Sequence, residues 1–194
     1  MTTDESAGER AYGERGRERP LLTLELTPAE WTVEDIEKLP HDGNRYELHE
    51  GSLVIMSPAI IWHSRVAGRL VWLFEQSGRI ATHEVGIKFG DRSTRIADVA
   101  AFAGEPDDRR AHHPPSAIAV AVEIVSPESE DRDVGSKPAK YAAAGIPEYW
   151  LVRFPADDNV KDADITRFTL ADGRYQAVGQ YKLSDLEKTG LPAD

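Results

Sequence analysis

The chain has 194 residues, a length that fits one domain with a substantial core but is short for two. It contains no cysteine, which excludes disulfides and thiolate metal sites, and no apolar run approaches the ~20 residues that a membrane-spanning helix needs. The formal net charge of -11 argues against a protein that coats nucleic acid through broad electrostatic contact.

The N-terminal segment, residues 1–25, lacks hydrophobic periodicity and is rich in Gly, Glu and Arg, so we expect a disordered tail. Its alternating charges include no apolar segment of the kind found in signal peptides, which makes a cytoplasmic protein without a membrane partner the default expectation. We expect the folded domain to occupy residues 26–183 and a C-terminal tail to occupy residues 184–194.

Short elements open this domain. The stretch TVEDIEKLP predicts a short helix, because Thr32 and Asp35 have the spacing of a capping box. NRYELHEGSLVIMSP then predicts two strands that turn at Glu50-Gly51. In IIWHSRVAGRLVWLFEQSG, apolar residues recur at helical spacing up to Gly78, which predicts the one long amphipathic helix.

Three extended segments follow, ATHEVGIKFG, TRIADVAAFA and AIAVAVEIVSP. Their apolar runs are long for a sheet with one wet face, so we expect the central pair to be covered on both faces. KPAKYAAAG predicts a second helix that ends at Gly145, EYWLVRF predicts a strand, and ITRFTLADGRYQAV predicts a hairpin that turns at Asp172-Gly173. This order predicts an α/β fold with one mixed central sheet flanked by helices.

Two acidic residues interrupt the apolar strands. Because side chains alternate along a strand, Glu123 is expected to share a face with Ala117, Ala119 and Ala121, whose small side chains would leave space beside it. Asp98 lies in the same kind of apolar surroundings in RIADVAAFA. A buried ionised carboxylate costs several kcal/mol unless something compensates its charge.

A divalent cation between two such acids would compensate both charges. Magnesium suits this arrangement, since it takes one or two carboxylates and keeps several waters that a substrate phosphate can replace. The alternative for each acid is an ion pair with an arginine or a solvated position at a strand end. Glu47, in RYELHEG, is a third candidate acid, for which Arg45 is a same-face partner.

These residues resemble the PD-(D/E)XK nuclease pattern, in which an Asp on one strand is followed by a Glu on the next. More specifically, RYELHEG, RIADVAAF, VEIVSP, KPAKYAAAGIPEYWLV and DGRY resemble, in order, the blocks of the Uma-type endonuclease family. The resemblance covers roughly residues 30–180. It implies a restriction-endonuclease-like core and an enzyme that uses Mg²⁺ or Mn²⁺ to hydrolyse phosphodiester bonds, with DNA as the expected substrate.

The resemblance also assigns roles to individual residues. It implies Asp98 and Glu123 as metal ligands, assisted by the backbone carbonyl of Val125, and Glu47 as the acid of the early block. Val125 stands where the motif's lysine is usually found, two residues after the acid, and the resemblance supplies Lys137 instead. A lysine near a helix N-terminus places a mobile positive charge where backbone N–H groups also face an anion.

Contacts with nucleic acid are expected in one locally basic region. Between positions 63 and 96 the basic residues outnumber the acidic ones, and the candidates for phosphate contacts are Arg65, Lys88, Arg92 and Arg95. A run of charges can equally be a solvated surface. His63 is interpreted as a packing residue of the long helix or as a minor contributor near the site. Double-strand cutting in the superfamily usually requires a dimer, so a homodimer is among the expected assemblies.

Two other functions fit the same sequence. A nuclease-like fold without catalysis could bind nucleic acid or protein, and the displaced lysine is the feature that favours this module. The buried acids could also have a purely structural role in a cytoplasmic interaction protein. Cleavage by the purified protein separates the first alternative from an enzyme, and the stability of a Glu123 variant tests the second.

Overall fold

The computed structural model describes residues 30–40, 43–56, 58–125, 136–157 and 159–192. Their centre is a mixed seven-stranded sheet with the order β5-β3-β4-β6-β7-β8-β9. Two neighbouring pairs, β3/β5 and β6/β7, are parallel, and the other pairs are antiparallel. The strands are β3 (Ala81–Gly90), β4 (Ser93–Phe102), β5 (His112–His113), β6 (Ile118–Val125), β7 (Glu148–Arg153), β8 (Asp164–Ala171) and β9 (Arg174–Lys182).

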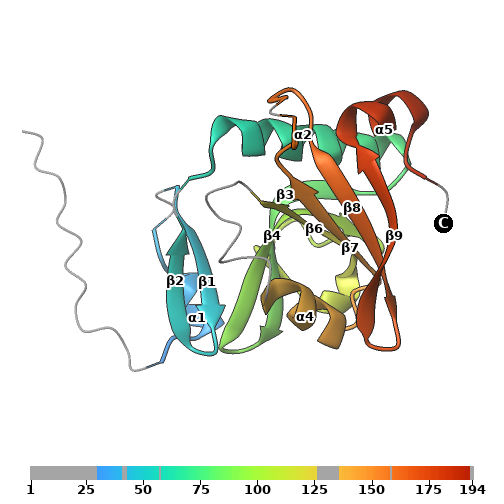
Figure 1. Ribbon diagram of the computed structural model, residues 1–194. Coiled ribbons are helices and arrows are strands. Elements are labelled where there is room, and N and C mark those ends of the chain that lie inside the picture. The colour runs from blue at the N-terminus through green and yellow to red at the C-terminus, as the bar shows by residue number, and fades with distance from the viewer. Residues whose placement is uncertain (1–29, 41–42, 57, 126–135, 158, 193–194) are drawn as a thin grey trace, which may run out of the picture.

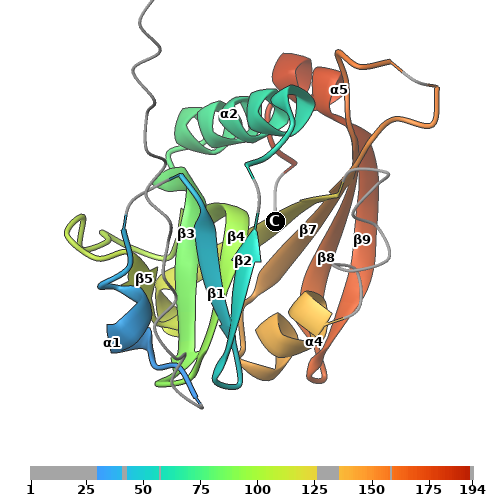
Figure 2. The same ribbon diagram turned by 90° about the vertical axis from the view of Figure 1, so that its left-hand side faces the viewer.

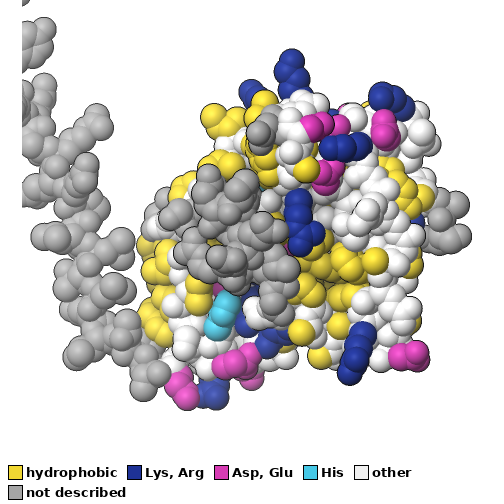
Figure 3. Space-filling model, viewed as in Figure 1, with side chains coloured by type: hydrophobic (Ala, Val, Ile, Leu, Met, Phe, Trp, Pro, Cys, Tyr) yellow, Lys and Arg dark blue, Asp and Glu magenta, His cyan; other side chains and the backbone are white. Residues whose placement is uncertain are grey.

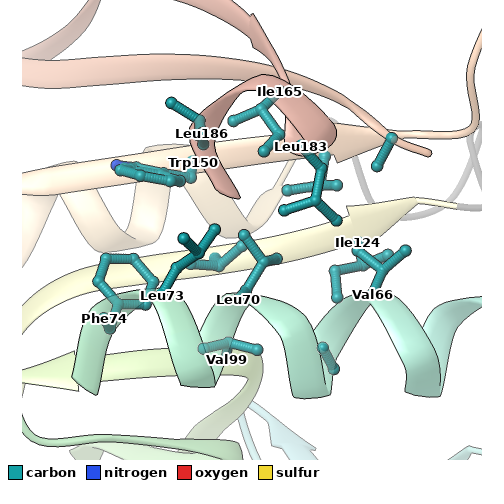
Figure 4. Packing of buried hydrophobic residues seen from close by; sticks show 14 of the residues in the cluster. Val66, Leu70, Leu73, Phe74, Val99, Ile124, Trp150, Ile165, Leu183 and Leu186 are labelled. Atoms are coloured by element: carbon teal, nitrogen blue, oxygen red, sulfur yellow. The ribbon is translucent and has the colours of Figure 1, made fainter. Parts of the chain in front are cut away.

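The long helix α2 (Ile61–Gln76) and the C-terminal helix α5 (Leu183–Thr189) cover one face of the sheet (Figure 1). Helix α2 buries the stripe that the sequence predicts, including Val66, Leu70 and Phe74. These side chains pack against β6 and β7, as Figure 4 shows for Ile124 and Trp150. This apolar layer fixes the positions of β6 and β7, which are neighbours in the sheet.

The shorter helix α4 (Ser136–Ala143) lies against the opposite face of the sheet (Figure 2). Its Tyr141 is fully buried against Ala121 on β6 and Tyr149 on β7. Every residue of β4 is buried, and β6 is buried except for the partly exposed Ala119. The prediction that the central pair is covered on both faces is therefore confirmed.

A separate hairpin of β1 (Arg45–His49) and β2 (Ser52–Met56) packs beside β4, with the short helix α1 (Val33–Ile36) nearby (Figure 2). Side chains of β4 hold β1 in place. The Thr94 hydroxyl accepts a hydrogen bond from the Leu48 N–H at 2.9 Å, and Arg95 Nη1 donates to the Leu48 carbonyl at 2.7 Å. These contacts fix the position of β1 along the length of β4.

The elements predicted from the sequence are present, with one exception at the C-terminus. The capping box of Thr32 and Asp35 forms, and Glu50-Gly51 and Asp172-Gly173 turn the two hairpins with positive φ at all four positions. The tail expected from residue 184 is wrong in its first part, because residues 183–189 form α5 and Leu186 is buried in the core.

The N-terminal tail expected at residues 1–25 lies outside the described residues. Among the described helices, none combines the length and the apolar character that crossing a membrane requires.

Candidate active site

Four buried ionisable side chains from four different elements meet at one place on the α4 side of the sheet. Glu47 comes from β1, Asp98 from β4, Glu123 from β6 and Lys137 from the first turn of α4. Each is less than a tenth exposed. The antiparallel register that pairs Val99 with Val122 places Asp98 and Glu123 at neighbouring positions of adjacent strands. The sequence prediction that these residues belong together is consistent with this geometry.

Asp98 is held by cationic and backbone donors. Its Oδ1 lies 3.1 Å from Arg45 Nη1 and 3.1 Å from His63 Nε2, and its Oδ2 accepts a hydrogen bond from the Ile124 N–H at 2.8 Å. Burial opposes the charged form, but the hydrogen bond with His63 and the charge of Lys137 outweigh it and hold the pKa of Asp98 below its ordinary value. Asp98 is therefore an ionised, oriented carboxylate.

Glu123 has a donor on each oxygen. Lys137 Nζ donates to Oε2 at 2.9 Å, and the Tyr141 hydroxyl donates to Oε1 at 2.6 Å. Burial raises the pKa of Glu123 to about 8 in spite of the positive charge of Lys137, and the charge of Asp98 adds to the rise. A cation bound at this position would favour the ionised form of the Glu123 carboxyl.

The Lys137 ammonium lies between three oxygen acceptors. Nζ is 2.9 Å from the Ile96 carbonyl, 2.9 Å from Glu123 Oε2 and 3.4 Å from Glu47 Oε1. Burial by itself would lower the pKa of Lys137, but the charges of Glu123 and Glu47 hold it above its ordinary value. Lys137 is buried, and the helix supplies the charge that the strand position of Val125 lacks.

Glu47 connects the early hairpin to this cluster. Its Oε1 accepts a hydrogen bond from the Ile96 N–H at 2.7 Å, and its Oε2 lies 2.8 Å from His49 Nε2. Burial opposes ionisation, but the charge of Lys137 and the hydrogen bond with His49 hold the pKa of Glu47 below its ordinary value. Because Ile96 also binds Lys137 through its carbonyl, Glu47 and Lys137 are positioned by the same peptide segment.

Several residues of the site have different partners from those expected. Arg45 binds Asp98, not Glu47, and the ring of His63 also reaches Asp98, so His63 contributes to the site beyond packing α2. Tyr141 and His49 had no role in the sequence prediction. A tyrosine in an amphipathic helix carries no signal that separates a core residue from a ligand to a carboxylate.

The space predicted beside Glu123 is filled. Ala121 lies on the α4 side, but Ala119 packs against the α2 side, because the register of β4 and β6 shifts between Ala101 and Phe102. Tyr141 and Lys137 occupy the space next to the Glu123 carboxylate. The expectation of an open, alanine-lined face is therefore wrong.

The chemistry of the donors fits a hard divalent cation. Within the described ranges, no three His, Asp or Glu side chains form a ready-made metal cluster. Magnesium needs only one or two carboxylates, and Asp98 and Glu123 supply two whose oxygens already lie beside Arg45, His63 and Lys137. Two cations of the protein, Arg45 and Lys137, thus lie where positive charge is favoured.

The four residues expected to contact phosphate differ in their surroundings. Arg65 is exposed on α2, whereas Lys88 pairs with Asp91 at 2.8 Å and Arg92 pairs with Glu30. Arg95 is 5% exposed and donates to backbone carbonyls, so its expected role as a phosphate contact is wrong for this conformation. On the face shown in Figure 3, Lys and Arg are scattered among other side chains and form no continuous stripe.

A pocket of about 290 Å³ adjoins the Asp98 end of the cluster. Arg45 and Ile96 line it, together with Tyr46, Glu84 and His112. Arg45 therefore borders both the pocket and the Asp98 carboxylate. The pocket therefore adjoins the buried cluster on the side where α1 lies.

The mixed seven-stranded sheet flanked by helices defines an α/β protein with a nuclease-like fold. The chain belongs to the Uma2 family, described as "Putative restriction endonuclease", whose model matches residues 33–192. A solved structure from Anabaena variabilis ATCC 29413, titled as a "putative nuclease belonging to DUF820", is similar over 78% of this chain and 83% of its own, with 16% identity and a TM-score of 0.53. No curated protein in the comparison matches the chain.

Proposed function

We propose that this protein is a metal-dependent endonuclease that hydrolyses phosphodiester bonds in DNA. The observation that carries the proposal is the buried Lys137 ammonium, bound to Glu123 and Glu47 beside the Asp98 carboxylate. A lysine and two or more carboxylates at such short distances are costly to bury, and an arrangement of this kind is typical of functional sites. The family to which the chain belongs supports the same reaction class.

Asp98 and Glu123 are the side chains that would hold Mg²⁺ or Mn²⁺, together with one backbone carbonyl. When bound, such an ion lowers the pKa of a water molecule and neutralises charge on the phosphate. The sequence predicts the Val125 carbonyl for this role. The side of β6 to which each residue's backbone groups point favours the Ile124 carbonyl instead. The N–H and C=O of one strand residue face the same neighbour, and the Ile124 N–H faces Asp98, so the Val125 carbonyl faces β7.

Lys137 would orient the attacking water and offset the negative charge that develops on the phosphate. The water oxygen attacks phosphorus in line and releases a proton to solvent. The bond from phosphorus to the 3′ oxygen breaks, and that oxygen takes a proton from solvent. Glu47 is the residue that holds Lys137 toward Glu123, and His49 fixes Glu47. His63 and Lys137 favour the ionised form of Asp98, and Arg45 and His63 orient this carboxylate before substrate binds.

The test uses purified full-length protein on supercoiled plasmid, single-stranded DNA and RNA, each with Mg²⁺, Mn²⁺ or EDTA. We expect nicking or linearisation of DNA that requires the ion. Asp98→Asn and Lys137→Met should reduce the rate about 100-fold or more, the magnitude typical of a lost electrostatic group in an active site. Lys188→Met, at an exposed ion pair on α5 away from the candidate site, is the matched control and should retain the rate.

Cleavage of RNA alone would correct the substrate, and DNA binding without any cleavage would favour the non-catalytic module. A wild-type protein that neither cleaves nucleic acid nor binds Mg²⁺ or Mn²⁺ by calorimetry would refute the proposed function.

A further inference from the structure

Helix α4 places two different donors on Glu123. Lys137 and Tyr141 are four residues apart, so they lie on one face of the helix, one turn apart. Lys137 donates to Oε2 at 2.9 Å and Tyr141 to Oε1 at 2.6 Å. One carboxylate oxygen therefore faces a mobile cation, and the other faces a neutral hydroxyl.

The two donors differ in how easily they can leave. The Tyr141 ring is fully buried, stacked with Phe89 at a centroid distance of 6.0 Å and packed near Tyr149 at 6.2 Å. Turning this ring away from Glu123 would open the core on the α4 side of the sheet. Lys137 has a flexible four-carbon stem and two further acceptors, Glu47 and the Ile96 carbonyl. Lys137 can shift toward these acceptors, whereas Tyr141 stays in place.

We propose that Tyr141 is a specificity-determining residue that leaves Glu123 only Oε2 for a metal ion and so favours Mg²⁺ over Ca²⁺. The inference rests on the proposed metal-dependent function of the same site. Calcium accepts six to eight ligands and commonly binds a carboxylate through both oxygens, whereas magnesium requires near-octahedral geometry with one oxygen from each carboxylate. A hydroxyl fixed on Oε1 opposes the two-oxygen mode without affecting the one-oxygen mode.

The experiment compares Tyr141→Phe with Tyr149→Phe in the full-length protein. Tyr149 is the matched control, because its buried hydroxyl has no hydrogen-bond partner among the described residues and its ring belongs to the same aromatic group. Calorimetric titrations with MgCl₂ and with CaCl₂ give the ratio of the two affinities. We expect Tyr141→Phe to lower the Mg²⁺ to Ca²⁺ ratio about tenfold, the effect of one hydrogen bond to a charged group, and Tyr149→Phe to leave it unchanged.

An unchanged ratio in Tyr141→Phe, with metal binding lost in Asp98→Asn, would overturn this inference and leave the proposed function intact. A wild-type protein that binds neither ion would overturn both. A second measurement needs no tyrosine variant. The infrared spectrum of the Mg²⁺-loaded wild type, minus that of Glu123→Gln, should show the wide separation of carboxylate stretches that one-oxygen binding gives, and a narrow separation would also overturn the inference.

Discussion

The lysine that binds Glu123 does not depend on this residue alone. The Nζ of Lys137, the cationic partner of Glu123, also lies 3.4 Å from Glu47 Oε1 and donates a hydrogen bond to the Ile96 carbonyl. Removing the Glu123 carboxyl therefore leaves Lys137 with Glu47 and the Ile96 carbonyl. Removing Lys137 would instead leave Glu123 and Glu47 buried without their shared cation, a change that typically costs about 3–5 kcal/mol. Substitution of Glu123 should therefore lower the free energy of unfolding less than substitution of Lys137.

The pH dependence of stability should reveal the raised pKa of Glu123. Its folded-state pKa of about 8 lies above the ordinary value of 4.5, so the folded protein holds an extra proton between these values. The stabilisation is complete below 4.5 and is lost as the pH rises through about 8. Glu123→Gln removes this titration, so its stability relative to wild type should increase with pH across that window. Urea unfolding in EDTA measures the difference.

Glu187→Gln is the control for this experiment. The hydrogen bonds from Arg69 hold the pKa of Glu187 below its ordinary value, so Glu187 stays ionised in the folded protein throughout the same window. Its difference from wild type should not change with pH there. A constant difference for Glu123→Gln as well would show that Glu123 is ionised in the folded protein and that the assigned pKa is wrong.

At the residue scale, the sequence indicates a site only where a residue conflicts with its surroundings. Asp98 and Glu123 interrupt apolar strands, and this conflict predicts them. Tyr141 produces no conflict, since an aromatic residue on an amphipathic helix is ordinary core. The phosphate contact expected of Arg95 is wrong for a related reason, because a charged pattern does not show that a guanidinium donates to the backbone of another element. These contacts depend on the tertiary structure.

At the element scale, α5 shows where local patterns are insufficient. Its seven residues hold only two apolar side chains, Leu183 and Leu186, too few for helical periodicity to be recognised. The helix depends on a distant residue, since Asp162 accepts hydrogen bonds from the Ser184 N–H at 2.9 Å and from the Ser184 hydroxyl at 2.8 Å. The longer elements were predictable because their periodicity and their glycine or Asp-Gly boundaries agree.

Helix α5 should contribute to global stability although it lies away from the candidate site. Leu186→Ala removes a side chain that is 2% exposed and packs with α2, so we expect a loss of about 2–5 kcal/mol in the free energy of unfolding. Lys188→Ala, at an exposed ion pair on the same helix, should change it by less than about 1 kcal/mol. Urea unfolding followed by circular dichroism compares the two. Equal, small effects would show that α5 is not part of the cooperative fold.

At the scale of the whole molecule, the acidic charge limits how the chain can hold a polyanion. With a net charge of -11 and with Lys88 and Arg92 already paired to acids, nonspecific attraction to DNA should be weak. The fold class follows from the apolar pattern along the chain, whereas the charged surface depends on which basic residues are buried or paired. Among the four expected phosphate contacts, Arg65 is the exposed one for which the structure gives no competing acid among the described residues.

DNA binding should therefore depend on Arg65 and vary only shallowly with salt. Each phosphate contact contributes about −0.9 to the slope of log K against log salt concentration, so we expect a slope of about −1 to −3. Arg65→Ala should weaken binding and make the slope about one unit shallower, whereas Lys88→Ala should change both less, because Lys88 has Asp91 as a partner. Fluorescence anisotropy with labelled duplex, in an Asp98→Asn background that prevents cleavage, measures both quantities. A larger loss in Lys88→Ala than in Arg65→Ala would place the DNA on the β3–β4 hairpin and not along α2.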